Sequence, residues 1–163
     1  MMDGRAKVVL ERTFDAEVEE VWELWTTGGG IESWWGPDGF EVKVRSLDLR
    51  PGGEMAYAMI TVGSEHKEFM RKAGMPLTTE LVLTFTEVTP LRRLAYQHLA
   101  DFVPGVEPYL VRHVIDFHAG PGTTRVVLTM DAMHDAEWTQ RATLGWEGEL
   151  EKLAAELAAR RTA

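Results

Sequence analysis

The sequence predicts an α+β domain in which a curved antiparallel sheet wraps around a long C-terminal helix and encloses an apolar cavity. Several segments alternate apolar and polar residues with a period of two, which is typical of half-buried strands. The segment 136–160 instead repeats apolar residues at spacings of three and four over about seven turns, which is typical of one long helix. The order is one strand, two helices, six strands and the long helix, and helices segregated in this way indicate α+β rather than a parallel sheet.

The N-terminal third contains the first strand and both short helices. The strand is expected at 7–14, and Asp15 offers an N-cap for an amphipathic helix over 16–25. The glycine triplet 28–30 is expected to end this helix, because consecutive glycines cost backbone entropy in a helix. A second short helix is expected around 31–35.

The rest of the chain alternates strands with turn signals. Further strands are expected at 40–45, 54–62, 80–88, 93–100, 109–117 and 124–130. Pro51-Gly52-Gly53 and Gly120-Pro121-Gly122 indicate turns. The connection 63–76 is expected to hold a short helix over Phe69, Met70 and Met75. Asp135 is the expected N-cap of the last helix.

Composition limits the classes of partner and compartment. The 163 residues fit one domain, 1–163, and the apolar content of 45% is in the globular range. A net charge of −9 argues against nucleic acid as a partner, because such binding depends largely on Lys and Arg. Residues 1–5 lack the apolar run of a signal peptide, and no stretch is long enough to span a membrane. We therefore expect a cytoplasmic protein without membrane insertion.

Charge runs and motifs exclude several kinds of site. The acidic residues Glu147, Glu149 and Glu151 are expected to form a solvated helical face. The five histidines show no metal-ligand spacing, so no metal site is expected. The triplet 28–30 is not a dinucleotide-binding motif, and no cofactor is expected. The chain has no cysteine and no Gly-x-Ser-x-Gly elbow, so catalytic residues stay unknown.

Motifs distributed along almost the whole chain resemble one known superfamily. They are Glu11-Arg12-Thr13-Phe14-Asp15-Ala16, Val21-Trp22-Glu23-Leu24-Trp25-Thr26, Trp34-Trp35-Gly36-Pro37, Leu47-Asp48-Leu49-Arg50-Pro51-Gly52-Gly53, and Gly145-Trp146-Glu147 with Leu150, Leu153 and Ala154. The chain resembles the START-like (SRPBCC) superfamily. More narrowly, it resembles the branch named after the C-terminal domain of the activator of heat-shock-protein-90 ATPase.

This resemblance implies a helix-grip fold, in which a curved antiparallel sheet of about seven strands grips the C-terminal helix and two short helices close one end. The superfamily includes lipid-transfer domains, hormone receptors, polyketide cyclases and chaperone activators, so the shared fold does not fix the function. The segment 65–79 is longer than the usual hairpin of the branch, which suggests a lid specific to this protein.

Five residues are predicted to bind a ligand in the cavity. His98 and His113 each share a strand face with apolar neighbours, and Tyr57 lies in a run of small or apolar residues. Met59 suits an adaptable apolar lining, and Trp146 lies midway along the gripped helix. Two further candidates of the same kind are Tyr96 and Arg112.

These features favour the binding of a small hydrophobic or amphipathic molecule in an internal cavity, without turnover. One alternative is an enzyme of cyclase or hydro-lyase type that uses His98, His113 or Tyr57 as general acid or base. Another is a protein-binding, chaperone-related module. A homodimer is also plausible, because strands with apolar residues on both faces, such as 80–88, need cover.

Overall fold

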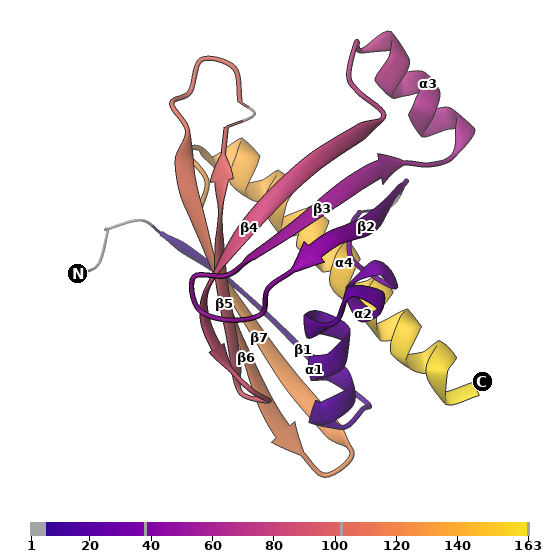
Figure 1. Ribbon diagram of the computed structural model, residues 1–163, viewed down its shortest axis with the longest axis vertical. Helices are drawn as coiled ribbons and strands as arrows, with labels where there is room; N and C mark the ends of the chain where they lie inside the picture. The colour runs from indigo at the N-terminus through magenta and orange to yellow at the C-terminus, as the bar shows by residue number, and fades with distance from the viewer. Residues whose placement is uncertain (1–5, 38, 102, 163) are drawn as a thin grey trace.

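The structure is a computed structural model and describes residues 6–37, 39–101 and 103–162. Residues 1–5, on which the expected absence of a signal peptide depends, lie outside the described residues. Figure 1 shows a curved sheet with a long helix running across one of its faces, which we call the inner face.

The described elements follow the predicted order, and the connection 63–76 holds the short helix expected there. They are β1 (Lys7–Phe14), α1 (Val18–Thr26), α2 (Gly28–Glu32), β2 (Phe40–Leu47), β3 (Glu54–Thr61), α3 (Ser64–Lys72), β4 (Thr78–Thr89), β5 (Arg93–Ala100), β6 (Tyr109–Gly120), β7 (Thr123–Asp131) and α4 (Ala136–Thr162). The strands form one antiparallel sheet in the order β1-β7-β6-β5-β4-β3-β2. The sheet and its long C-terminal helix confirm the predicted α+β, helix-grip fold.

The junction between α1 and α2 differs from the prediction. The glycine triplet does not end a helix but forms the first turn of α2, and the break is confined to Thr27, whose backbone is extended. The Thr27 hydroxyl accepts a hydrogen bond from the Gly30 N–H over 3.0 Å and so caps the new helix. A Cβ on Gly30 would lie 2.6 Å from the Glu23 carbonyl oxygen, so only glycine lets the two helices approach this closely.

The caps of α1 and α4 also test the prediction. Helix α1 starts after Glu17 rather than after Asp15, and no side chain caps it. The chain bends at Asp15 and Ala16, where the Ala16 N–H donates to the Phe14 carbonyl over 2.9 Å and the Ala16 carbonyl accepts the Thr124 hydroxyl proton over 2.8 Å. The helix begins only after this bend. At α4 the predicted cap is confirmed, because Asp135 Oδ1 accepts the Trp138 N–H over 2.8 Å.

Helix α3 occupies most of the segment that was expected to hold a lid. It ends at Lys72, so it includes Phe69 and Met70 but not Met75. Figure 1 shows it at the far end of the β3–β4 hairpin, where it projects away from α4.

The sheet opens at one end between β4 and β5, and we call this opening the split. The two strands pair from Thr89 and Arg93 up to Leu83 and His98, and no further. Beyond that point the first residues of β4, 78–82, pair with β3. The last residues of β5 pair with β6. The split leaves a gap in the sheet next to the predicted ligand residue His98.

The outer face of the sheet carries exposed apolar side chains. Val82, Leu99 and Leu110 are about half exposed, and Leu99 is the register partner of Leu110. This is the kind of surface that prompted the expectation of a homodimer, which stays a prediction.

Among the described helices, none combines the length and the apolar composition needed to cross a membrane.

Candidate functional site

A cavity of about 140 Å³ lies between the inner face of the sheet and α4. The loop after α2 closes one side of it, and strands β3 to β6 form its floor. The residues that line it are Trp35, Pro37, Tyr57, Met59, Leu83, Tyr96, His98, His113, Trp146 and Glu149.

All five predicted ligand residues line this one cavity. Tyr57 and Met59 come from β3, His98 from β5, His113 from β6 and Trp146 from α4. Alternation along each strand puts the four strand residues on the inner face, because side chains two apart point the same way. The structure therefore brings the set together, while its role in ligand binding stays a prediction.

His113 is held at the floor of the cavity by aromatic neighbours. Its ring stacks on Tyr96, with centroids 4.9 Å apart and an angle of 11° between the planes. The two are cross-strand partners in the β5–β6 register, which places their side chains on one face. The His98 ring lies 5.3 Å from the His113 ring, so the two histidines also meet.

The protonation state of His113 follows from these contacts. Its Nε2 accepts the indole N–H of Trp146 over 3.3 Å, which leaves the ring proton on Nδ1. Burial disfavours the imidazolium and, with the neighbouring His98, lowers the pKa of His113 to about 3. The Val111 backbone and Asp131 favour the protonated ring more weakly. His113 is therefore neutral at pH 7.

Burial also shifts the other groups that the enzyme alternative requires. The pKa of His98 is lowered by desolvation, and the pKa of Tyr57 is raised by desolvation with a contribution from Glu149. The pKa of Tyr96 is raised well above its ordinary value for the same reason. The Tyr96 hydroxyl is fully buried and has no hydrogen-bond partner among the described residues.

Glu149 is the cavity residue that the sequence interpretation missed. It was expected on a solvated face, but it is only 8% exposed. Its Oε1 accepts the backbone N–H of Gly36 over 2.8 Å, and Lys152 Nζ donates to the Gly36 carbonyl over 2.7 Å. The peptide groups of Gly36 thus link the loop after α2 to α4. Burial raises the pKa of Glu149 to about 7, against the opposing effects of Gly36 and Lys152.

Four tryptophans form the wall behind the cavity. Trp25 and Trp146 stack with centroids 5.9 Å apart, and Trp35 lies 6.0 Å from Trp146. Trp34 fills the space between them and donates its indole N–H to the Leu24 carbonyl over 2.8 Å. This packing fixes one wall of the cavity as rigid aromatic surface.

Arg112 is not part of the site, contrary to the prediction. It follows the odd-even alternation of β6 and lies on the opposite face from His113. There its Nε donates to Asp131 Oδ2 over 3.0 Å, and Lys7 forms an ion pair with the other oxygen of the same carboxylate. Although burial raises the pKa of Asp131, the hydrogen bonds from Lys7 and Arg112 outweigh it and lower the pKa.

A groove of about 590 Å³ adjoins the cavity at the split between β4 and β5. It shares Tyr57, Met59 and His98 with the cavity, and it continues outward along Leu81 and Leu99. The gap in the sheet therefore offers a route from solvent to the cavity.

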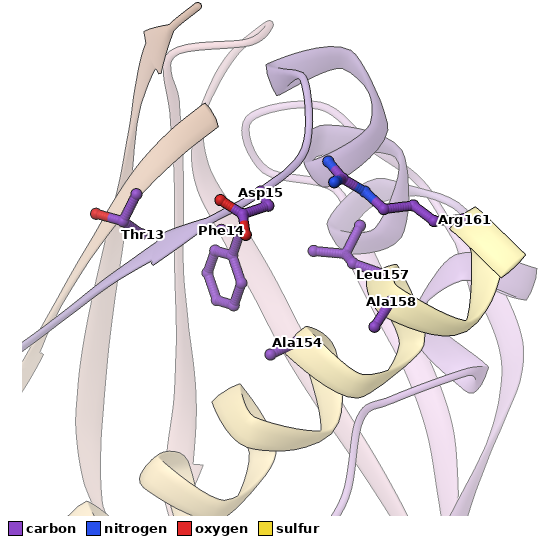
Figure 2. A pocket seen from close by; sticks show the side chains of 7 residues that line it. All are labelled: Thr13, Phe14, Asp15, Ala154, Leu157, Ala158 and Arg161. Atoms are coloured by element: carbon purple, nitrogen blue, oxygen red, sulfur yellow. The ribbon is translucent and has the colours of Figure 1, made fainter. Parts of the chain in front are cut away.

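Another hollow lies at the opposite end of the molecule, between the end of β1 and the last turns of α4 (Figure 2). Its volume is about 370 Å³, and Asp15 and Arg161 lie on opposite sides of it. Both of these polar side chains belong to exposed residues, and the buried lining residues Phe14 and Leu157 are apolar. A buried polar group that could orient a ligand is found in the inner cavity, which we take as the candidate site.

Within the described parts of the chain, no cluster of three or more His, Cys, Asp or Glu residues is arranged to hold a metal ion. The site is thus built from aromatic rings, two neutral imidazoles, two buried phenols and one carboxyl group.

The fold and the cavity under its gripped helix define a START-like helix-grip protein. The family model described as "Activator of Hsp90 ATPase homolog 1-like protein" matches residues 15–158, and the chain belongs to this family. No curated protein matches the chain.

Solved structures of similar fold come from several bacteria. Protein CV1439 from Chromobacterium violaceum superposes with a TM-score of 0.74 at 21% identity, over 91% of this chain and 94% of that chain. Protein NE0264 from Nitrosomonas europaea superposes with a TM-score of 0.71 at 22% identity, over 99% of this chain and 100% of that chain. The AHSA1-like protein from Aeromonas hydrophila superposes with a TM-score of 0.72 at 23% identity, over 97% of this chain and 96% of that chain. At these identities the likeness shows the fold alone.

Proposed function

We propose that the protein binds a small amphipathic molecule in the inner cavity. The observation that carries this proposal is the combination of an apolar and aromatic lining with a few buried polar groups, among them the unpartnered Tyr96 hydroxyl. Buried polar groups are normally hydrogen-bonded, so an orphaned hydroxyl beside a cavity is best explained by a ligand or water that completes it. The START-like fold often binds hydrophobic ligands, which agrees with this reading.

The cavity volume limits the size of the ligand. About 140 Å³ is less than the roughly 300–1,000 Å³ of sites for drug-sized molecules. It is close to the roughly 150 Å³ that accommodates a benzene ring in an apolar protein cavity. The buried part of the ligand should therefore be about the size of one aromatic ring, and any larger part would extend into the groove at the β4–β5 split.

Native mass spectrometry on gently purified protein tests this proposal. We expect a one-to-one complex with a small molecule that is released on denaturation. Leu83→Phe places extra volume in the cavity and should abolish the complex, because Leu83 is buried in its lining. Leu110→Phe makes the same change on the exposed outer face and should leave the complex intact. Bare protein in all three samples, or an adduct that survives Leu83→Phe, would contradict the proposal.

A second candidate function is proton-transfer catalysis, and one observation favours it. Glu149 is the cavity group whose pKa, at about 7, matches that of a general acid or base at neutral pH. His113, with a pKa of about 3, is a poor base at that pH. The molecule released from the native complex would be incubated with fresh protein in D₂O, and NMR would follow its structure and its uptake of deuterium. Conversion or exchange that Glu149→Gln abolishes would support catalysis, and the absence of both would exclude it for that molecule.

A further inference from the structure

The lining of the site carries charge of one sign. Among the described residues that line the cavity and the adjoining groove, those with a formal charge are Glu149, Glu80 and Asp101, and neither Lys nor Arg occurs. Glu80 is ion-paired with Arg45 over 3.2 Å, so the negative charge of the lining rests mainly on Glu149 and Asp101. Both histidines of the cavity have lowered pKa values because they are buried. The path from the groove to the cavity therefore favours cations over anions.

One oxygen of Glu149 is available to a ligand. Its Oε1 is held by the Gly36 N–H, whereas no hydrogen bond from a described residue reaches Oε2. A buried carboxylate needs a partner of opposite charge or a proton, because desolvation disfavours the bare anion. Lys152 supplies part of this compensation from outside the lining, where its ammonium group is bonded to the Gly36 carbonyl.

Aromatic rings line the same cavity as this carboxyl group. Trp35, Tyr57, Tyr96 and Trp146 all line the cavity, and the Trp35 ring centroid lies 6.0–6.1 Å from the other three. The faces of such rings attract organic cations, most strongly where water is excluded. The buried Tyr96 hydroxyl, which has no partner among the described residues, is a second polar group for a ligand.

We propose that the ligand of this cavity is a small organic ammonium ion, with its charged nitrogen at Glu149 Oε2 and its apolar part against the aromatic rings. This inference rests on the proposed function and specifies the chemical class of the ligand. A neutral molecule of the same shape would add no positive charge to the partial compensation that Lys152 supplies.

Two probes of equal size distinguish the contribution of the ligand's charge to binding from the contribution of its shape. Benzylammonium and benzyl alcohol have the same number of non-hydrogen atoms and differ in the charged group. Both would be titrated at pH 8 into the ¹⁵N-labelled full chain, and the indole N–H signal of Trp146 would be followed. That group is bonded to His113 at the cavity floor and reports on occupation of the site.

We expect benzylammonium to bind the wild type at least about tenfold more tightly than benzyl alcohol. Glu149→Gln should weaken the affinity for benzylammonium by about tenfold or more and change the affinity for benzyl alcohol by less than about threefold. The amide oxygen of Gln can still accept the Gly36 N–H, which preserves the fold. Glu151→Gln removes the same charge from an exposed position on the same helix and should change neither affinity.

Protonation of Glu149 gives an independent readout. The titratable groups that face it are Lys152 on α4, Tyr57 on β3, Tyr96 on β5 and, across the cavity, His98 and His113. The pKa values of both tyrosines are raised and that of His113 is about 3, so none of these three changes charge between pH 6 and 8. Over this range benzylammonium affinity should rise by up to about tenfold, while benzyl alcohol affinity stays level.

The possible failures are distinguishable. Equal affinities for the two probes, unchanged by Glu149→Gln, would overturn the ammonium assignment and leave the proposed ligand-binding function standing. If neither probe shifts the Trp146 signal at millimolar concentration, both the assignment and the proposed function are wrong.

Discussion

Trp146 donates its indole N–H to Nε2 of His113, and this 3.3 Å contact joins the gripped helix α4 to the floor strand β6. The donor fixes His113 as the neutral tautomer with its proton on Nδ1. Protonation of His113 would set an imidazolium N–H against the indole N–H, in a site with little access to water. The contact is therefore compatible with one charge state of the histidine, and stability should depend on pH.

Acid should destabilise the fold through His113. The folded state keeps this histidine neutral down to about pH 3, whereas the unfolded chain binds a proton below about 6.5. The stabilising difference is present above pH 6.5 and is lost as the pH falls. Because Glu149 acts in the opposite direction over the same pH range, the His113 effect is measured in a Glu149→Gln background. In that background we expect a loss of about 2–3 kcal/mol in the free energy of unfolding between pH 7 and 4.5, measured by urea denaturation. Adding His113→Gln, which keeps an acceptor for Trp146, should remove this dependence, and adding His118→Gln at an exposed position should retain it. Equal pH profiles for all three proteins would refute the burial argument.

Ionisation of Glu149 should make the fold less stable as the pH rises, which is the opposite of the effect of His113. Its pKa is raised from 4.5 to about 7 in the folded state, so folding favours the protonated acid. This stabilisation is complete below pH 4.5 and is lost as the pH rises through 7. Measured as the difference between the wild type and Glu149→Gln, this contribution should fall by about 2–3 kcal/mol between pH 5 and 9. Glu149→Gln should itself gain stability over that range, because the opposing effect of His113 remains, while Glu151→Gln should follow the wild type. A direct measurement of the Glu149 pKa by ¹³C NMR that gave a value near 4.5 would rule out this prediction.

The ion pairs on the outer face should differ in strength. Asp131 is 1% exposed and is held by Lys7 and Arg112, whereas Asp116 is bound mainly by Arg93 near the surface, over 2.7 Å. Asp131→Asn should cost about 1–2 kcal/mol, because it weakens the hydrogen bonds made by a buried carboxylate, while the side chains of Lys7 and Arg112 are 38% and 43% exposed and keep access to water. Asp116→Asn should cost less than about 1 kcal/mol. Chemical denaturation of both variants at pH 7 provides the comparison, and equal costs would show that burial does not govern the Asp131 contact.

The glycine triplet offers a matched pair of substitutions. Gly30→Ala would bring a Cβ within 2.6 Å of the Glu23 carbonyl oxygen and 2.8 Å of Leu24 Cα, so we expect a loss of about 2–3 kcal/mol or more. Gly29 is exposed, and a Cβ there would meet nothing within 4 Å. Gly29→Ala should therefore be neutral or stabilise by up to about 1 kcal/mol, since it lowers the entropy of the unfolded chain. Thermal denaturation of the two variants tests the close approach of α1 and α2, which an equally mild effect at both positions would disprove.

The sequence predicted the strands and the inward positions well because period-two alternation is a local signal. The alternation along three strands correctly placed four residues in one cavity, namely Tyr57, Met59, His98 and His113. Trp146 joined them because the apolar spacing along the last helix defines its buried face. The family motifs then supplied the order of the elements, which alternation alone does not give.

The parts that could not be predicted depend on contacts between distant segments. Glu149 lies three residues after Trp146 and four before Leu153, so helical spacing did place it on the buried face. Its partner Gly36, however, is 113 residues away in the sequence, and nothing local indicates that a glutamate there is bonded rather than solvated. The break at Thr27 has the same origin, since the close packing of α1 and α2 overrode the local preference of Gly28–Gly30. The end of the β4–β5 pairing at Leu83 likewise has no local signal in the sequence.

The most direct test of the account locates a small ligand in the cavity. Isotope-filtered nuclear Overhauser measurements on labelled protein with benzyl alcohol report which side chains touch the ring. The account predicts contacts from the ring protons to the Met59 methyl, the Leu83 methyls and the Trp146 indole, all of which line the cavity. Contacts confined to residues outside this lining, or none at millimolar ligand, would contradict the claim that the cavity under α4 is the binding site.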